Sequence, residues 1–375
     1  MTVTPFTVEF SDDAIADLRK RLADARWPDR ETVDGWSQGV PLAYLQELCR
    51  YWANDFDFAA AQDRMNRFPQ YRTPIDGLDI HYLHVPSRHA DALPVVLTHG
   101  WPGSFVEFLG VIDALANPDD PADAFHVVVP SLPGYGFSSK PTATGWNLAR
   151  VGAAWDALMR GLGYERYGAQ GGDWGALLAN AMARNYVAHV VGVHVNLAAF
   201  DFSKIDKTDL TPEEQEGLAR LGEHARVGRG YAEQQTTRPQ TLGYGLTDSP
   251  AAQCAWILEK YWAWSDCDGH PERALTREQM LDNISVYWFT ATATSSARMY
   301  WENPSRQGEG DQPITVPAGM TMFPKEIMRV SQRWAETAYH DLRWFHDADR
   351  GGHFAAWEQP ELFVDEVRGF FRTVR

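Results

Sequence analysis

The residues GAQGGDWGAL at 168–177 place an aspartate between glycines where an apolar run gives way to a helical pattern. A small-x-acid-x-small sequence of this kind can form a sharp strand-to-helix turn that projects its central side chain, Asp173, above the carboxyl edge of a sheet. Gly171 and Gly175 satisfy the steric demand of so tight a turn. Because Gly-Gly-Asp also occurs in ordinary turns, the motif alone does not identify a nucleophile.

A carboxylate and a histidine follow Asp173 in the order that triads built on such a turn require. His353, in DADRGGHFAAWEQP, comes just after the last predicted strand, so its loop reaches the same edge of the sheet. Glu326, in VPAGMTMFPKEIM, follows the preceding strand and is the preferred acid. The alternative is that Glu326 is an ordinary surface carboxylate beside Lys325. The other acids considered are Asp311, Asp341, Asp347 and Asp349. We expect the last two, which are near His353 in sequence, to shape its turn.

A possible oxyanion hole lies in the stretch THGWPGS, directly after an apolar strand. The backbone N–H groups of Trp101 and of Trp174, the residue after Asp173, are the two expected donors. Both tryptophans are also expected to line the substrate pocket. The alternative is a simple turn at this stretch, and His99 is assigned to loop structure rather than to catalysis.

These side chains need a sheet whose strands end at one edge, and the hydrophobic pattern predicts such a sheet. Strand signals occur at 94–100, 126–134, 166–175, 190–200, 314–320 and 342–348. Their alternation with helical segments indicates an α/β fold with a mostly parallel sheet. An Asp-Gly turn within 75–86 predicts an antiparallel hairpin before the first of these runs.

Helical patterns surround and interrupt this sheet. Residues 11–26 have Ser11 as the expected N-cap and an apolar face, and a second helical pattern starts at Pro41. Ser249 and Pro250 open another helix within an aromatic-rich stretch that shows no strand signal. The expected divisions are an N-terminal extension, a first core part, a helical lid and a second core part, at 1–72, 73–198, 199–304 and 305–375.

Composition narrows the classes of partner. The chain has 375 residues and a formal net charge of -16, which opposes binding to nucleic acid or to anionic lipid. No stretch is apolar enough to span or anchor in a membrane, and the N-terminus has no export signal. Cys49, Cys254 and Cys267 show no metal-binding spacing, so we expect reduced thiols, a cytoplasmic location and no metal.

The ordered motifs resemble those of the epoxide hydrolases of the microsomal type, which have the α/β-hydrolase fold. The resemblance covers nearly the whole chain and rests on RFPQYRTPIDGLDIHYLHV, HGWPGS, PSLPGYGFSS, GGDWG, LTDSP, ARMYWEN, FPKEI and GGHFAAWEQP. It implies a mostly parallel sheet with a helical lid insertion and an N-terminal helical extension. The membrane anchor of the mammalian members has no counterpart in this sequence.

The resemblance also implies a role for each site residue. Asp173 corresponds to the nucleophile, His353 to the base and Glu326 to the partner of the base. Two lid tyrosines hold the epoxide oxygen in this family, and Tyr300 in ARMYWEN matches one of them. Tyr231 in GRGYAEQQ matches the other, although Tyr244 in LGYGL lies nearby and remains an alternative.

The chemistry of epoxide opening explains an aspartate at the nucleophile position. A serine attacking the epoxide carbon would form an ether, which an activated water cannot cleave at a useful rate. A carboxylate forms an ester, whose carbonyl can be attacked by water that His353 activates. The leaving alkoxide needs a donor, and a tyrosine hydroxyl can supply it.

Two other functions are alternatives. A haloalkane dehalogenase would share the aspartate and the histidine but would not need the lid tyrosines. A catalytically silent binding protein could share the fold alone. The favoured function is hydrolysis of a small apolar epoxide by water to a vicinal diol. We expect no cofactor, and a homodimer is possible.

Overall fold

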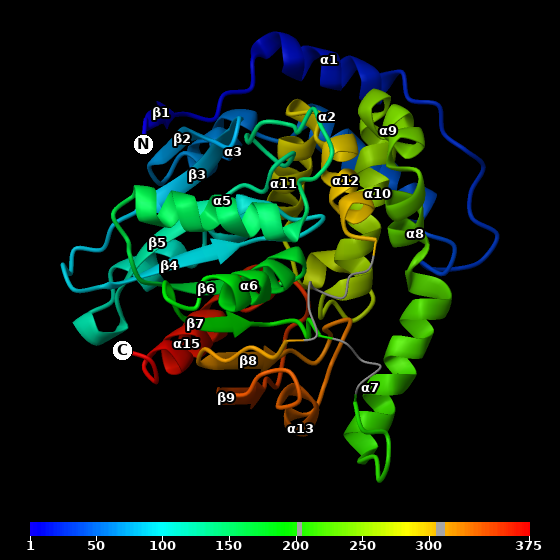
Figure 1. Cartoon of the computed structure of the whole chain (residues 1–375). Coiled ribbons are helices and arrows are strands. Elements are labelled where there is room, and N and C mark those ends of the chain that lie inside the picture. Colours follow the sequence, from blue (N-terminus) through cyan, green and yellow to red (C-terminus); the bar gives the residue numbers. More distant parts are fainter. Residues whose placement is uncertain (201–204, 305–311) are drawn as a thin grey trace.

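The computed structural model describes residues 1–200, 205–304 and 312–375 of the chain. Its nine strands form one sheet in the order β1-β2-β3-β5-β4-β6-β7-β8-β9 (Figure 1). The strands are β1 Thr4–Phe6, β2 Gln70–Ile75, β3 Leu78–Val85, β4 Leu93–Thr98, β5 Phe125–Pro130, β6 Tyr167–Gly171, β7 Val190–Val195, β8 Ala318–Met322 and β9 Leu342–Asp347. From β5 to β9 every pairing is parallel, and the edge from β1 to β3 is antiparallel.

The helices cover this sheet and its carboxyl edge. They are α1 Asp12–Ala23, α2 Leu42–Asn54, α3 Phe58–Met65, α4 Ile112–Ala116, α5 Leu148–Gly161, α6 Trp174–Asn185, α7 Pro212–Glu223, α8 Gly230–Thr237, α9 Pro239–Asp248, α10 Pro250–Trp264, α11 Arg277–Phe289, α12 Ala293–Glu302, α13 Gln332–Ala335, α14 Ala355–Glu358 and α15 Pro360–Phe371. In Figure 1, α5 and α6 lie in front of the sheet and α15 passes behind it. The parallel sheet is therefore covered on both faces, as the α/β pattern predicts.

The predicted hairpin is present at the start of the sheet. Strands β2 and β3 pair antiparallel, and Asp76 and Gly77 between them both have positive φ angles, 48° and 82°. An Asp-Gly pair suits these angles because glycine has no Cβ and aspartate tolerates the left-handed region. The chain reaches the parallel strands through this hairpin.

The N-terminal extension lies over the lid helices at the top of Figure 1. Ser11 caps α1 as predicted, because its side chain accepts a hydrogen bond from the N–H of Ala14. Trp52 on α2 donates its indole N–H to Ser285 on α11 over 3.0 Å. Arg64 on α3 binds the carboxylate of Asp282, also on α11, at 2.7 and 2.8 Å. The extension is thus attached to the lid by buried and half-buried polar contacts.

The lid is helical, as its sequence pattern predicts. Residues 205–304 contain α7 to α12 and no strand. Ser249 accepts a hydrogen bond from the N–H of Ala252, and Pro250 occupies the first turn of α10. The expected lid boundaries adjoin residues 201–204 and 305–311, which lie outside the described residues.

One predicted strand is displaced. The strand expected at 314–320 is β8, and it begins only at Ala318. Ile314 forms an isolated bridge with Tyr339. Pro317 separates the two, and because proline has no backbone N–H it cannot donate to a sheet ladder. The prediction of a strand here is correct, but its bounds are wrong.

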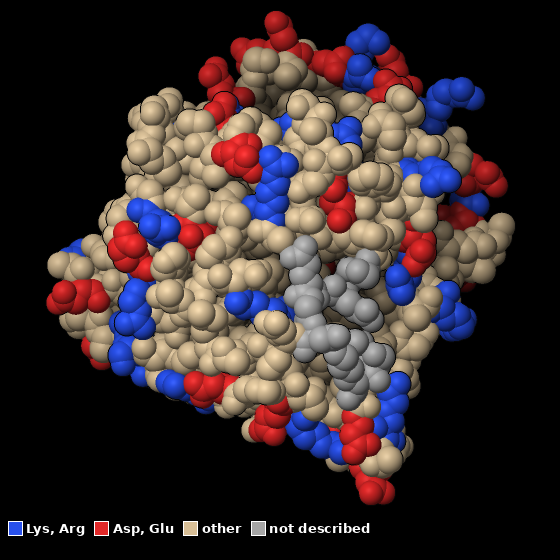
Figure 2. All heavy atoms as spheres, in the orientation of Figure 1, with Lys and Arg blue, Asp and Glu red and all other residues tan. Residues whose placement is uncertain are grey.

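The face shown in Figure 2 carries acidic and basic side chains interspersed among other residues. Among the helices within residues 1–200, 205–304 and 312–375, none combines the length and the apolar character that a membrane span requires.

Candidate active site

Asp173 stands on a strained turn between β6 and α6. Its φ of 50° and ψ of -126° are unfavourable for a residue with a side chain, so the surrounding packing must hold them. A Cβ added to Gly171 would lie 2.2 Å from the backbone of Gly175. A Cβ added to Gly175 would lie 1.9 Å from the carbonyl oxygen of Thr98. Both neighbours of the turn must therefore be glycine, as the motif predicts.

The Asp173 carboxylate faces two of the predicted site residues. Its Oδ1 accepts a hydrogen bond from the backbone N–H of Trp101 over 2.9 Å. Its Oδ2 lies 3.6 Å from Nε2 of His353. One oxygen is thus held by a backbone donor, while the other faces the imidazole.

His353 is in turn held by Glu326. Nδ1 of the imidazole lies 2.9 and 3.1 Å from the two carboxylate oxygens of Glu326. Both residues are buried, at 6% and 2% exposure. The N–H of His353 also donates to the carbonyl of Trp264 at the end of α10, which fixes its loop against the lid.

The competing acids lie elsewhere. Asp347 pairs with Arg329, Asp349 with Arg350, and Asp341 with Arg343. Asp311 lies outside the described residues. Among those compared acids that the structure describes, Glu326 is the one that contacts His353.

The charges around His353 favour its protonated form. Burial lowers the pKa of the imidazole, but the charge and hydrogen bonds of Glu326 and the charge of Asp173 more than offset this and raise the pKa to about 9. The ring is therefore an imidazolium at neutral pH. The contribution of Asp173 requires its negative charge.

A small cavity adjoins these groups. Its volume of about 20 Å³ is enough for about one water molecule. Its lining residues are Thr98, His99, Gly100, Trp101, Glu107, Phe108, Gly172, Asp173, Asn196, His353, Phe354, Ala355, Ala356 and Phe363. Burial raises the pKa of Glu107 to about 8, so this carboxyl is largely neutral at pH 7. Sequence reasoning did not identify Glu107, although it follows the oxyanion stretch closely.

The lid brings two tyrosines against the rings of Trp101 and Trp174. Tyr231 stacks on the indole of Trp101, with ring centroids 5.0 Å apart and an interplanar angle of 9°. Tyr300 meets the indole of Trp174 edge-on at 4.9 Å, and it lies 5.9 Å from Tyr231. The side chain of Tyr244 is exposed to 70% and does not join this cluster. Of these two candidates, Tyr231 is therefore the one that lies in this cluster.

Lid helix α11 holds the loop that carries the Trp101 N–H. The side-chain amide of Asn283 donates to the carbonyl of Pro102 over 2.7 Å. The hydroxyl of Tyr287 donates to the carbonyl of Gly103 over 2.8 Å. These contacts were not predicted, because they join residues far apart in the sequence.

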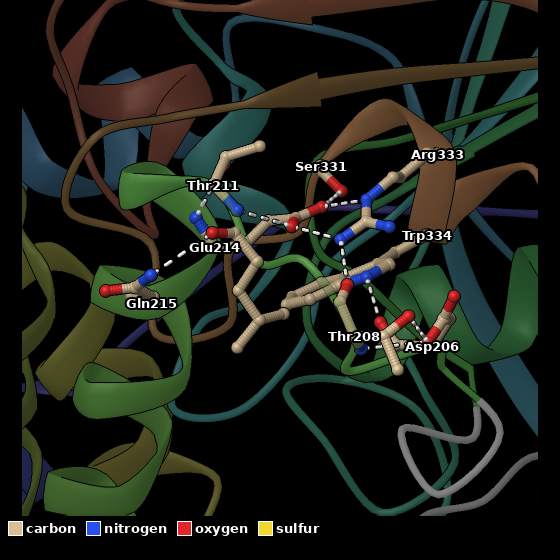
Figure 3. A network of polar contacts seen from close by, with 9 residues as sticks. Asp206, Thr208, Thr211, Glu214, Gln215, Ser331, Arg333 and Trp334 are labelled. Carbon is tan, nitrogen blue, oxygen red and sulfur yellow. Dashed lines mark hydrogen bonds and ion pairs between the residues drawn. The ribbon is translucent and has the colours of Figure 1, made fainter.

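The segment after Glu326 is fixed by α7, the first lid helix. Figure 3 shows the buried carboxylate of Glu214 against Ser331 and Arg333. Glu214 also accepts from the N–H of Thr211 and so completes a capping box. Arg220 on the same helix donates to the carbonyl of Pro324, two residues before Glu326. The lid therefore supports the segment that carries Glu326 and also supplies the two tyrosines.

The described residues show no group of three His, Cys, Asp or Glu side chains arranged to bind a metal ion. Cys49, Cys254 and Cys267 are buried free thiols.

Family comparisons agree with this geometry. Residues 3–108 match the family described as "Epoxide hydrolase N terminus", and residues 94–264 match "alpha/beta hydrolase fold". A protein from Stigmatella aurantiaca (strain DW4/3-1) is 52% identical over 100% of this chain and 86% of that protein. "Epoxide hydrolase 1" from Sus scrofa is 34% identical over 98% of this chain and 88% of that protein.

A solved structure is similar over the whole chain. The juvenile hormone epoxide hydrolase from the silkworm Bombyx mori superimposes with a TM-score of 0.93 at 31% identity. The match covers 100% of this chain and 95% of that structure. The expected fold class is confirmed, and the chain belongs to the epoxide hydrolases of the microsomal type, which are enzymes of the α/β-hydrolase fold.

Proposed function

We propose that this epoxide hydrolase works through an ester between its substrate and Asp173. In the first step an oxygen of Asp173 bonds to an epoxide carbon, and the bond from that carbon to the ring oxygen breaks. Tyr231 and Tyr300 donate hydrogen bonds to the departing oxygen, and one of them transfers its proton to the alkoxide. The position of both phenols beside Trp101 and Trp174 supports this role.

In the second step water cleaves the ester. A water molecule in the small cavity gives one proton to His353 and attacks the carbonyl carbon of Asp173. The oxyanion is stabilised by the N–H groups of Trp101 and Trp174. Collapse breaks the bond between that carbon and the substrate oxygen, which takes the proton from His353. The second proton of the water restores the phenol, so one epoxide and one water give one diol.

The change in charge at Asp173 connects the two steps. While Asp173 is ionised it helps to keep His353 protonated. Esterification removes that charge, so the pKa of His353 falls and the imidazolium releases its proton to solvent, which leaves a neutral imidazole to accept a proton from water. The ring takes a proton back from solvent when Asp173 is ionised again. Glu326 remains to stabilise the imidazolium that forms.

The single observation that carries this proposal is the placement of the Asp173 carboxylate between the Trp101 N–H and His353. An oxyanion donor and the base are thus both near the carboxyl carbon of Asp173, which is the atom that water attacks in the second step. The nearby aromatic rings make an apolar, aryl-bearing epoxide the expected substrate class.

Trapping the ester tests the proposal. Because His353 serves only the second step, His353→Gln should open styrene oxide but fail to release the diol. Mass spectrometry should then find the substrate mass added to the peptide that contains Asp173. A His353→Gln enzyme that forms no adduct, or that still turns over at the wild-type rate, would contradict the assignment.

A further inference from the structure

A buried lysine lies beside the aromatic cluster on lid helix α10. Lys260 is only 3% exposed. Its Nζ lies 4.3 Å from the centroid of the Tyr231 ring and 5.5 Å from that of Trp264. Its ion-pair partner is the neighbouring Glu259. Burying an ammonium group is unfavourable, so this position against Tyr231 needs a compensating interaction.

We propose that Lys260 acts through Tyr231, by stabilising the negative charge that the phenol acquires as it donates its proton to the epoxide oxygen. The inference rests on the proposed donor role of Tyr231. A cation attracts a neutral ring weakly through its quadrupole, but it attracts a phenolate as one full charge attracts another. The interaction therefore strengthens as the epoxide opens. Lys260 is a positioning residue, and it speeds alkylation without tightening substrate binding.

The surroundings of Tyr231 make this effect specific. Its ring stacks on Trp101, whose backbone N–H binds the nucleophile, so the phenol and the reacting carboxylate share one support. The opposing charge of Glu259 does not cancel that of Lys260, because the Glu259 side chain is 31% exposed and that of Lys260 only 4%. Water screens the more exposed carboxylate better than the buried ammonium. We therefore expect the charge of Nζ to outweigh that of Glu259 at the Tyr231 ring.

Single-turnover kinetics with styrene oxide separate the two steps and test this inference. With enzyme in excess, rapid quenching and mass spectrometry follow the formation and the decay of the Asp173 ester. Lys260→Met should slow ester formation about tenfold and leave its decay within about twofold of wild type. Lys260→Arg, which keeps a cation, should restore most of the rate. If Lys260→Met does not fold, Lys260→Gln replaces it with the same expected slowing.

Two controls distinguish charge from packing. Glu259→Gln removes the counter-charge but keeps the cation, so it should not slow ester formation. In a Tyr231→Phe background, Lys260→Met should have no further effect, because the group that it acts through is gone. The inference is overturned if Lys260→Met leaves ester formation unchanged or slows both steps alike. It is also overturned if Glu259→Gln slows ester formation, or if the Lys260→Met factor persists without the phenol. Wild-type ester formation in Tyr231→Phe alone would instead remove the donor role of Tyr231.

Discussion

Replacing Glu326 with glutamine removes one negative charge from beside the buried imidazole of His353 and leaves the size of the side chain almost unchanged. Other buried histidines of this protein show how large the effect on the pKa should be. His81, His99 and His194 are buried as deeply as His353, and burial lowers their pKa values to about 3, about 4 and about 4. The pKa of His353 is raised to about 9, so its carboxylates account for a gap of about 5.

Glu326 should account for about half of this gap. Two charges roughly 4 Å apart interact by about 4 kcal/mol at an effective dielectric constant of about 20. This corresponds to about 3 in pKa. We therefore expect the pKa of His353 in Glu326→Gln to fall from about 9 to near its unperturbed value of about 6.5. Because the imidazolium forms during ester hydrolysis, that step should slow by about 10²- to 10³-fold, while ester formation is spared.

Two assays measure this effect. Titration of the His353 ring followed by nuclear magnetic resonance gives the pKa in the free enzyme, and the single-turnover decay of the Asp173 ester gives the rate. Hydrolysis should be slowed less than in His353→Gln, because a neutral amide can still orient the ring. Asp349→Asn is the matched control, since that side chain is 78% exposed and pairs with Arg350. The reasoning is refuted if Glu326→Gln hydrolyses the ester at the wild-type rate, or if the pKa of His353 stays near 9.

Further predictions concern the lid. Tyr300→Phe should slow ester formation by about 10²-fold in presteady-state kinetics with little change in substrate binding, because its hydroxyl matters most as charge develops on the epoxide oxygen. The control Tyr244→Phe, at an exposed position, should have no effect. An unchanged rate of ester formation in Tyr300→Phe would remove Tyr300 from the mechanism. Glu214 has its pKa lowered to about 2, chiefly by its hydrogen bonds to Arg333, from an unperturbed 4.5. Its contribution to the free energy of unfolding is present above pH 4.5 and is lost as the pH falls towards 2, so Glu214→Gln should destabilise the protein at pH 7 more than at pH 3 in urea unfolding. An equal loss at both pH values would contradict this assignment.

Local stereochemistry made much of the fold and part of the site predictable. The turn at Asp173 follows from a rule that involves only its neighbours, because Gly171 and Gly175 leave no room for a Cβ. The alternation of strand and helix patterns predicted the sheet, because the central strands β4 and β5 are short, mostly apolar runs. Glu326 was preferred to its competitors because it follows the strand before the last one, while Asp347 and Asp349 lie too near His353 in the sequence.

Other features depend on packing that no local pattern contains. Tyr231 and Tyr244 lie on neighbouring lid helices, and only the orientation of those helices buries one and exposes the other. Lys260 contacts Tyr231, and Glu107 lies in the cavity beside Asp173 and His353, so these residues distant in sequence set their roles and neither charged residue stood out. The shift of β8 has a simpler cause, because the prediction of a strand at 314–320 gave too little weight to Pro317.

The central claim is that Asp173 bonds to the substrate, and the origin of the new oxygen in the diol tests it most directly. In the ester route Asp173 gives one of its own oxygens to the diol, and the oxygen of water enters the aspartate. In the competing route Asp173 acts only as a base, and the water oxygen goes straight into the diol. A single turnover of styrene oxide with enzyme in excess, in heavy-oxygen water, should give mostly unlabelled diol and a labelled Asp173 peptide. Labelled diol from an enzyme whose Asp173 stays unlabelled would contradict the nucleophile assignment.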